Sequence, residues 1–449
     1  MIQKEIQRDW ISDLGDGLML RRATPADSEE LANFNAQIHG DDPADAERVG
    51  AWTRDLLEKS HPTFKPGDFT VVEDTRCRKI VSTLCLISQT WAYGGIPFGV
   101  GRPELVGTLP EYRGRGLVRA QFEVVHNWSA AKGHMAQVIT GIPYYYRQFG
   151  YEMGLALGGG RQGFKPNLPH LKDGSPEPVR IRPATEADLS FIAGLYDTSC
   201  QRSLVSCVWG DALWRYELSG KDRKNVNRFE LRIIETPTGE RIGYLAHPFF
   251  NWGAVLVAVF YELAPGVSWG MVTPSVARYL YATGQTLAAA AGKQAEFGGF
   301  GFNLGEVHPA YQVLHEALPK VRQPYAYYVR VPDLPAFILR IKPVLESRLA
   351  ASPYSGHSAE LPITFYRSGL RLVLEKGRLT QVIAWQPAPQ GHSGLAGFPG
   401  LAFLQMLFGY RSLEELHYSF ADCWYENDEV FGLLNALFPR QASDVWPIS

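Results

Sequence analysis

A short motif occurs twice in this chain and constrains its fold more than any other feature of the sequence. Residues 18–27 read LMLRRATPAD, and residues 179–188 read VRIRPATEAD. In both places an extended stretch leads into Ala-Thr-x-x-Asp, which is typical of a helix start because Thr is a favoured N-cap residue. The repetition predicts two domains of similar fold in tandem. The alternative is a chance likeness of one strand-to-helix junction.

The length of 449 residues suggests about three domains at ~100–200 residues each. Stretches rich in proline and polar residues, at 165–177 and 331–335, divide the chain. We therefore predict domains at 1–165, 178–331 and 335–449. The third domain reads as a helix followed by strands at 361–366, 369–375 and 378–385, which indicates a small α+β domain.

Charge and cysteine content exclude several classes of protein. The net charge is -2, from 44 Lys and Arg against 46 Asp and Glu, so the basic excess of a nucleic-acid or membrane-surface binder is missing. The five cysteines include no C-x-x-C pair, which favours reduced thiols in a cytoplasmic protein. We also expect no metal site, because the Cys and His residues show no zinc-ligand spacing.

No segment is typical of a secretory signal or a membrane span. The N-terminus, MIQKEIQRDW, has no apolar core. The longest apolar stretch, 253–261, is far shorter than the ~18 residues that span a bilayer. Its length predicts one buried strand.

The residues that point to chemistry lie at 106–119, VGTLPEYRGRGLVR. A strand over 105–109 leads through a turn rich in Gly and Arg into a helix expected over 117–131. Gly114 and Gly116 let the backbone approach a bulky anion, and the free amides at the helix start favour negative charge there. The arginines that can add charge-assisted hydrogen bonds are Arg113, Arg115 and Arg119. The turn predicts a pyrophosphate site.

Two familiar phosphate loops do not fit this turn. A P-loop needs Lys and then Ser or Thr after its last Gly, where this chain has Leu117 and Val118. The dinucleotide fingerprint needs three spaced glycines early in a βαβ unit. The remaining alternative is an ordinary helix start with surface arginines.

Arg113-x-x-Gly116 resembles the acetyl-CoA loop of the GNAT superfamily of N-acetyltransferases. The last position of that pattern, Gly or Ala, is Val118 here. The segment 146–152, YRQFGYE, is similar to a late motif of the same superfamily. With the repeat, the third domain and the segments 403–416 and 444–449, the chain resembles the enhanced intracellular survival (Eis-like) family.

The resemblance implies an α+β fold with two tandem GNAT-like domains, whose central mixed β-sheets are flanked by helices, and a C-terminal sterol-carrier-like α+β domain. It also implies acetyl-CoA as co-substrate. The residues that would hold the pantetheine arm and the pyrophosphate are Val106, Gly107, Thr108, Arg113, Gly114, Arg115, Gly116, Leu117, Val118 and Arg119, with Gly141 and Ile142 on the opposite side.

Acetyl transfer to an amine needs a proton donor for the leaving thiolate and a base for the amine. By resemblance, Tyr146 is the general acid, since a phenol of pKa ~10 is protonated at neutral pH. The alternatives are a purely structural Tyr146 in an aromatic core, or an acid role for Tyr144 or Tyr145. The carboxylate of Ser449 is the base that the resemblance implies, although the best-known member of the family ends in an aromatic residue. A solvated terminus is the alternative.

Other residues are candidates for binding the acceptor. We expect Glu104 to be solvated at a strand end, with attraction of a cationic amine as the alternative. His39, Asp41 and Asp42 follow the first helix, where domains of this type place acceptor-binding residues.

These inferences predict an N-acetyltransferase that works by direct attack through a tetrahedral intermediate. The acceptor would be a primary amine, either a small aminoglycoside-like polyamine or a lysine side chain. The second domain has no Arg-x-x-Gly at the matching place, 272–279, so we expect it to bind no cofactor. Resemblance also suggests a homo-oligomer, a trimer or hexamer. The alternative function is a non-catalytic carrier or regulatory protein that binds coenzyme A or a lipid.

Overall fold

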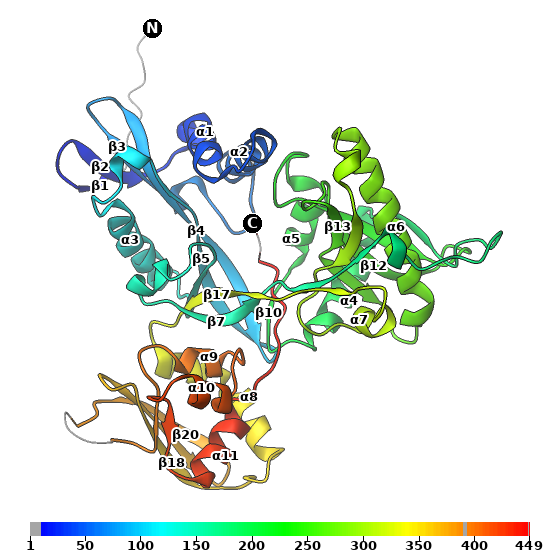
Figure 1. Cartoon of the computed structure of the whole chain (residues 1–449). Helices are drawn as coiled ribbons and strands as arrows, with labels where there is room; N and C mark the ends of the chain where they lie inside the picture. Colours follow the sequence, from blue (N-terminus) through cyan, green and yellow to red (C-terminus); the bar gives the residue numbers. More distant parts are fainter. Residues whose placement is uncertain (1–9, 389–392, 448) are drawn as a thin grey trace.

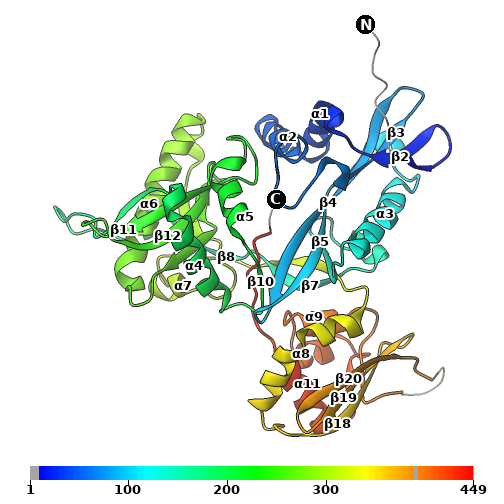
Figure 2. The ribbon, with the colours of Figure 1, turned by 180° about the vertical axis from the view of Figure 1, so that it is seen from behind.

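Figure 1 shows a computed structural model of the chain, which describes residues 10–388, 393–447 and 449. The first lobe (blue and cyan) and the second lobe (green) lie side by side, and the third lobe (yellow to red) lies below them in both views (Figures 1 and 2). Residues 1–9, on which the prediction about a secretory signal rests, lie outside the described part. None of the described helices combines the length and the apolar character that a membrane crossing requires.

The first lobe is built on a nine-stranded mixed sheet, counted over the described residues. Its strands, in spatial order, are β1 (Trp10–Asp13), β2 (Leu18–Arg22), β3 (Phe69–Asp74), β4 (Lys79–Tyr93), β5 (Ile96–Thr108), β6 (Ala136–Ile139), β17 (Tyr325–Arg330) and β7 (Glu152–Leu157), with β10 (Val205–Cys207) paired to β4.

Helices cover both faces of this sheet. They are α1 (Ser28–His39), α2 (Pro43–Glu58) and α3 (Leu117–Ala131). Because side chains alternate along β4, Cys85 packs in one core with the apolar residues of α1 and α2, whereas Leu84 packs in another with Phe122 of α3. The predicted helix over 117–131 is confirmed.

The first and second lobes exchange strands. β17 comes from the second half of the chain but lies between β6 and β7. In return, β8 (Gly160–Phe164) pairs with strands of the second lobe. Each of these two sheets therefore contains a strand from the other side of the expected domain limit at 165. The expected domain limits, at 165 and at 331, stay predictions.

The repeated motif forms the same local structure twice. In the first lobe the backbone N–H of Thr24 donates to the Asp27 carboxylate at 2.7 Å, and Arg21 forms an ion pair with that carboxylate at 2.7 Å. In the second lobe the corresponding distances are 2.9 Å and 2.8 Å. The residues that make these second-lobe contacts are Arg182, Thr185 and Asp188. The likeness at the two junctions therefore extends to their hydrogen bonds.

The second lobe contains two small sheets. One has the order β14 (Phe260–Leu263), β12 (Arg241–Pro248), β11 (Phe229–Glu235) and β9 (Arg180–Pro183). The other has the order β13 (Val255–Ala258), β15 (Gly299–Phe302), β8 and β16 (Lys320–Arg322). The helices of this lobe are α4 (Leu189–Cys200), α5 (Asp211–Arg215), α6 (Trp269–Ala290) and α7 (Pro309–Val313).

The prediction of one strand over 253–261 is wrong. The chain changes partner at Val259, so β13 pairs with β15, whereas β14 pairs with β12 of the other sheet. Both strands are buried, which explains why the sequence reads as one apolar run.

The third lobe packs helices on a mixed sheet, which gives the α+β arrangement that its sequence predicts. The helices are α8 (Leu334–Ala350), α9 (Phe403–Leu407), α10 (Leu413–Ser419) and α11 (Asp428–Leu437). The strands are β18 (Ala359–Thr364), β19 (Gly369–Glu375), β20 (Arg378–Trp385), β21 (Ala396–Gly397) and β22 (Trp424–Tyr425). The expected α+β architecture, with mixed sheets flanked by helices, is therefore confirmed for the chain.

After α11 the chain runs as an extended segment between the first and second lobes (red in Figures 1 and 2). The backbone N–H of Leu204 donates to the Ala442 carbonyl at 3.0 Å, and the Tyr327 hydroxyl donates to the Val445 carbonyl at 3.3 Å. This segment carries Ser449 to the centre of the first lobe's sheet.

Candidate active site

The site begins where two parallel strands separate. β5 and β6 pair only at Val100–Ala136 and Gly101–Gln137. Further along β5, Leu105 has a φ of 51°, in the left-handed region, and the register with β4 shifts at the same place. This β-bulge stores strain of about 1–3 kcal/mol and re-aims the following backbone, as bulges beside active sites do.

A cleft of about 840 Å³ opens beyond the bulge. Its lining includes every residue expected to hold coenzyme A, together with Tyr146. The residues expected from the sequence that line it are Val106, Gly107, Thr108, Arg113, Gly114, Arg115, Gly116, Leu117, Val118, Arg119, Gly141, Ile142 and Tyr146. Ser449 does not belong to this lining.

The turn before α3 leaves backbone amides free for an anion. Gly114 and Gly116 both have a φ of 76°, a conformation that favours glycine. Gly116 is the N-cap of α3, so no side-chain hydrogen bond caps the first turn of this helix. An anion at this end would therefore meet unsatisfied amides and the positive end of the helix dipole.

The arginines of the turn are held at the rim of the cleft. Arg113 donates to the Thr108 carbonyl at 3.2 Å, and Arg119 donates to Gln148 at 2.8 Å. The Arg115 guanidinium lies 5.1 Å from the centre of the Tyr112 ring. These contacts orient positive charge beside the free amides of α3.

Tyr146 combines a buried ring with a hydroxyl at the cleft. The ring lies in a cluster with Phe122 and Tyr328, at centroid distances of 6.0 and 5.5 Å. Burial raises the pKa of Tyr146, so its phenol stays protonated at neutral pH. Its hydroxyl has no hydrogen-bond partner among the described residues. The ring is thus part of an aromatic core while the hydroxyl is available to a ligand.

The expectation of a solvated Glu104 is wrong. β5 starts at Ile96, so Glu104 lies well inside the strand, and its side chain is 14% exposed. Arg102 forms an ion pair with it at 2.6 Å. Burial raises the pKa of the Glu104 carboxyl, although Arg102 opposes this shift.

Arg102 also connects the site to the end of the described chain. Its Nη1 donates to the Ser449 hydroxyl at 2.9 Å, and Ser449 is 5% exposed. Ser449 is therefore buried next to the cleft wall. Its expected role as the base stays a prediction.

The expected acceptor-binding residues separate into two groups. His39 lines the cleft, and burial lowers its pKa to about 4. Its Nε2 is buried without a hydrogen-bond partner in the described structure. Asp41 and Asp42 do not line the cleft. Asp42 instead caps α2 by accepting from the Asp45 N–H at 2.8 Å.

The sequence reasoning missed the wall that α2 supplies. Val49 and Trp52 line the cleft from this helix. Their i, i+3 spacing places them on one helix face, which predicts burial but not which surface they would contact.

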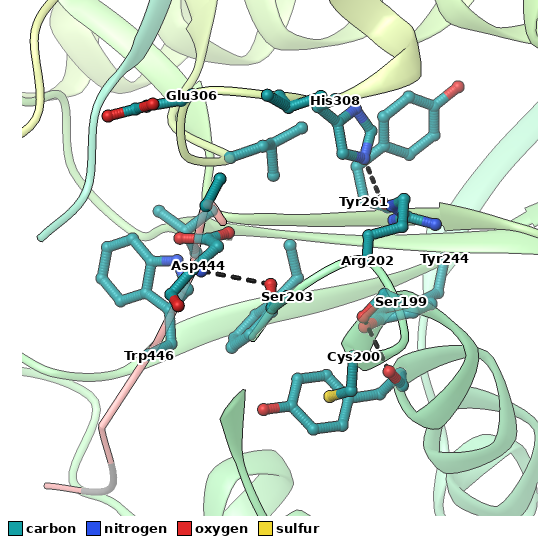
Figure 3. Close-up of a pocket in the computed structure, with 17 residues that line it drawn as sticks. Ser199, Cys200, Arg202, Ser203, Tyr244, Tyr261, Glu306, His308, Asp444 and Trp446 are labelled. Atoms are coloured by element: carbon teal, nitrogen blue, oxygen red, sulfur yellow. Dashed lines mark hydrogen bonds between the residues drawn. The ribbon is translucent and has the colours of Figure 1, made fainter. Parts of the chain in front are cut away.

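The matching place in the second lobe is nearly closed. β13 and β15 pair at four positions, from Val255–Gly299 to Ala258–Phe302, before they separate. The remaining pocket has a volume of about 60 Å³ and is shown in Figure 3. His308 fills the gap, since its Nε2 donates to the Tyr261 carbonyl at 3.1 Å. The Trp269 ring packs on both, at 5.2 Å from His308 and 5.0 Å from Tyr261.

The tail of the chain covers the other side of this pocket. The Asp444 N–H donates to the Ser203 hydroxyl at 3.2 Å, and Trp446 lies alongside (Figure 3). Within the described part of the chain, no three His, Cys, Asp or Glu side chains are grouped so as to hold a metal ion.

Comparison with known proteins identifies the domain that holds the open cleft. Residues 19–154 match the family described as "Acetyltransferase (GNAT) domain". This span contains the bulge, the glycine turn and Tyr146. The predicted GNAT domain is therefore confirmed. No match was found among curated proteins.

Solved structures share the fold over nearly the whole chain. A GCN5-related N-acetyltransferase from Kribbella flavida is 19% identical with a TM-score of 0.62, covering 95% of this chain and 97% of its own. A probable N-acyltransferase from Enterococcus faecalis is 13% identical with a TM-score of 0.61, covering 96% and 99%. Eis1 from Mycobacterium abscessus is 13% identical with a TM-score of 0.55, covering 95% and 99%. At these identities the likeness shows the fold.

Proposed function

Since residues 19–154 form a GNAT acetyltransferase domain, we propose that this protein is an acetyl-CoA-dependent N-acetyltransferase acting on a primary amine. The observation that carries the proposal is the cleft between β5 and β6. Its lining joins a free helix N-terminus, three arginines and a protonated phenol. A pyrophosphate, a thioester and an amine each find suitable chemistry there.

The two ends of the cleft divide the work. The α3 amides with Arg113 and Arg115 bind the pyrophosphate of the co-substrate. The pantetheine arm then follows Val106, Gly107 and Thr108 along β5, where an extended chain can pair with backbone groups. The bulge at Leu105 turns the next backbone amide out of the regular ladder, towards the position of the acetyl oxygen.

The transfer itself is a direct attack. The neutral amine adds to the thioester carbonyl and forms a tetrahedral intermediate, with a new C–N bond and negative charge on oxygen. Collapse of this intermediate breaks the C–S bond, and Tyr146 donates its proton to the leaving thiolate sulfur. A base accepts the proton that the amine loses.

Glu104 and Ser449 are the candidates for this base. Burial raises the pKa of the Glu104 carboxyl, which makes it a better base than a solvated carboxylate. Arg102 contacts both residues and can hold either near the amine. The acceptor class, the cytoplasmic location, the oligomeric state and a sterol-carrier role of the third lobe stay predictions.

An acceptor screen tests the function. Purified protein is mixed with acetyl-CoA and a panel of primary amines, and free thiol is measured as it forms. We expect amine-dependent thiol release, with the acetylated amine detected by mass spectrometry. Thiol release without amine measures hydrolysis and is subtracted. Coenzyme A binding without turnover of any amine would contradict the proposal and favour a carrier protein.

A further inference from the structure

The two ends of the cleft differ in charge. The cofactor end carries Arg113, Arg115 and Arg119. The opposite wall, formed by the end of α1 and the middle of α2, is mainly apolar. Its side chains are Ile38, His39, Val49 and Trp52.

Glu104 is the only acidic residue among the residues described as lining this cleft. Its carboxylate is already paired with Arg102 at 2.6 Å. The acidic residues of the α1–α2 turn, Asp41, Asp42 and Asp45, do not line the cleft. Asp42 caps α2, and Asp45 pairs with Arg48 at 3.2 Å. The described lining therefore offers one carboxylate to an ammonium group, since Ser449 is buried against Arg102 and does not belong to the lining.

The polar group on the apolar wall is neutral. Burial lowers the pKa of His39 to about 4, so its ring carries no charge at neutral pH. Its Nε2 lies in the cleft wall over β5, where a β-carbon on Gly107 would meet it at 3.5 Å. Since Nε2 has no partner among the described residues, it can form one hydrogen bond with an acceptor molecule.

These features select against polycations. Bringing an ammonium group against Ile38, Val49 and Trp52 without a counter-charge removes its hydration and costs several kcal/mol. An aromatic or aliphatic body gains free energy on the same wall, at about 25 cal/mol per Å² of apolar surface buried. A ring can also stack on Trp52.

Resting on the proposed acetyltransferase function, we propose that the acceptor is a monoamine on an apolar, aromatic body. Its nitrogen lies at Glu104, its body packs on Ile38, Val49 and Trp52, and His39 binds a polar substituent. The same wall disfavours an aminoglycoside-like polyamine.

Two amines of similar basicity test the acceptor class. Initial rates are measured at saturating acetyl-CoA with 2-phenylethylamine and with spermidine. We expect kcat/KM for 2-phenylethylamine to be at least about tenfold higher, equivalent to about 1.4 kcal/mol. Equal or higher kcat/KM for spermidine would overturn this inference while leaving the acetyltransferase function intact.

A matched pair of variants separates the wall from the rest of α1. Ile38 is half-buried at the cleft, whereas its neighbour Gln37 is exposed. Ile38→Asp should shift the ratio of the two kcat/KM values at least tenfold towards spermidine. Gln37→Asp should leave it within twofold. An unchanged ratio in a folded Ile38→Asp variant, checked by circular dichroism, would contradict the assignment of the wall.

A binding measurement covers the case in which neither amine is turned over. Both amines are titrated by calorimetry into protein saturated with coenzyme A. Tighter binding of 2-phenylethylamine supports the inference, and tighter binding of spermidine overturns it. Absence of coenzyme A binding overturns the proposed function itself.

Discussion

The phenol oxygen of Tyr146 faces the backbone of Gly141 at the edge of the cleft, and a β-carbon on Gly141 would lie 3.6 Å from that oxygen. Gly141 has a φ of 123°, which favours glycine. The hydroxyl thus reaches the cleft beside a backbone segment that carries no side chain. A leaving sulfur could approach it there.

Removal of this hydroxyl should slow the chemical step. General acid catalysis contributes about 10²–10⁴-fold to rates, so Tyr146→Phe should lower kcat at least about 100-fold. The KM for acetyl-CoA should change less than about threefold, because the ring still packs on Phe122. Steady-state thiol release measures both constants.

Tyr145→Phe is the matched control, since Tyr145 also lines the cleft and lies next in sequence. Its kcat should stay within about threefold of the wild-type value. A Tyr146→Phe enzyme of wild-type kcat would remove the acid role from Tyr146.

Charge reversal in the glycine turn should weaken binding of the co-substrate. A hydrogen bond to a charged group contributes about 1.5–3 kcal/mol. Arg113→Glu with Arg115→Glu should therefore raise the Kd for coenzyme A at least about 100-fold by calorimetry. The effect should shrink as salt screens the charges.

Arg223→Glu is the control, because Arg223 is an exposed arginine of the second lobe and does not line the cleft. Its Kd should match that of the wild type. Equal Kd values for the double variant and the wild type would exclude the turn as the pyrophosphate site.

Each chain should bind one molecule of coenzyme A. The first-lobe cleft measures about 840 Å³, whereas the matching pocket of the second lobe measures about 60 Å³ and is lined by His308, on which Trp269 packs. A stoichiometry of one per chain is expected by calorimetry. A ratio of two, or loss of only half of the sites in the Arg113→Glu, Arg115→Glu variant, would contradict it.

Acid should destabilise the fold before the carboxylates titrate. Burial lowers the pKa of His308 to about 3. The Ala310 N–H donates to its Nδ1 at 3.2 Å while Nε2 donates to Tyr261, so both bonds require the neutral ring. Unfolded histidine titrates near pH 6.5, so between pH 6.5 and about 3 the unfolded state binds more protons, and the free energy of unfolding decreases as the pH is lowered.

For His308 this loss is about 1.4 kcal/mol at pH 5.5 relative to pH 7.5. In urea unfolding at both pH values, the free energy of unfolding that His308→Gln loses between pH 7.5 and pH 5.5 should be smaller than the wild-type loss by that amount. His315→Gln, which changes an exposed histidine of the same lobe, should show the wild-type loss. Equal losses in His308→Gln and the wild type would mean that His308 is not held neutral.

Local features of this protein were open to prediction from sequence. The Thr24–Asp27 junction, its copy at Thr185–Asp188, and the glycine turn before α3 all depend on hydrogen bonds and backbone angles within a few residues. Such contacts form between neighbours in the chain, so residue types at fixed spacing indicate them. The GNAT-type loop could be found for the same reason.

The surroundings of the site were decided by the tertiary structure. Strand β17 reaches the first lobe's sheet from the second half of the chain, and the Ser449 side chain meets Arg102 across 347 residues of sequence. The burial of Glu104, the apolar wall with Trp52 and the closure of the second pocket by His308 arise in the same way. Burial and pairing depend on which distant segments pack together, and residue spacing within one segment holds no record of that choice.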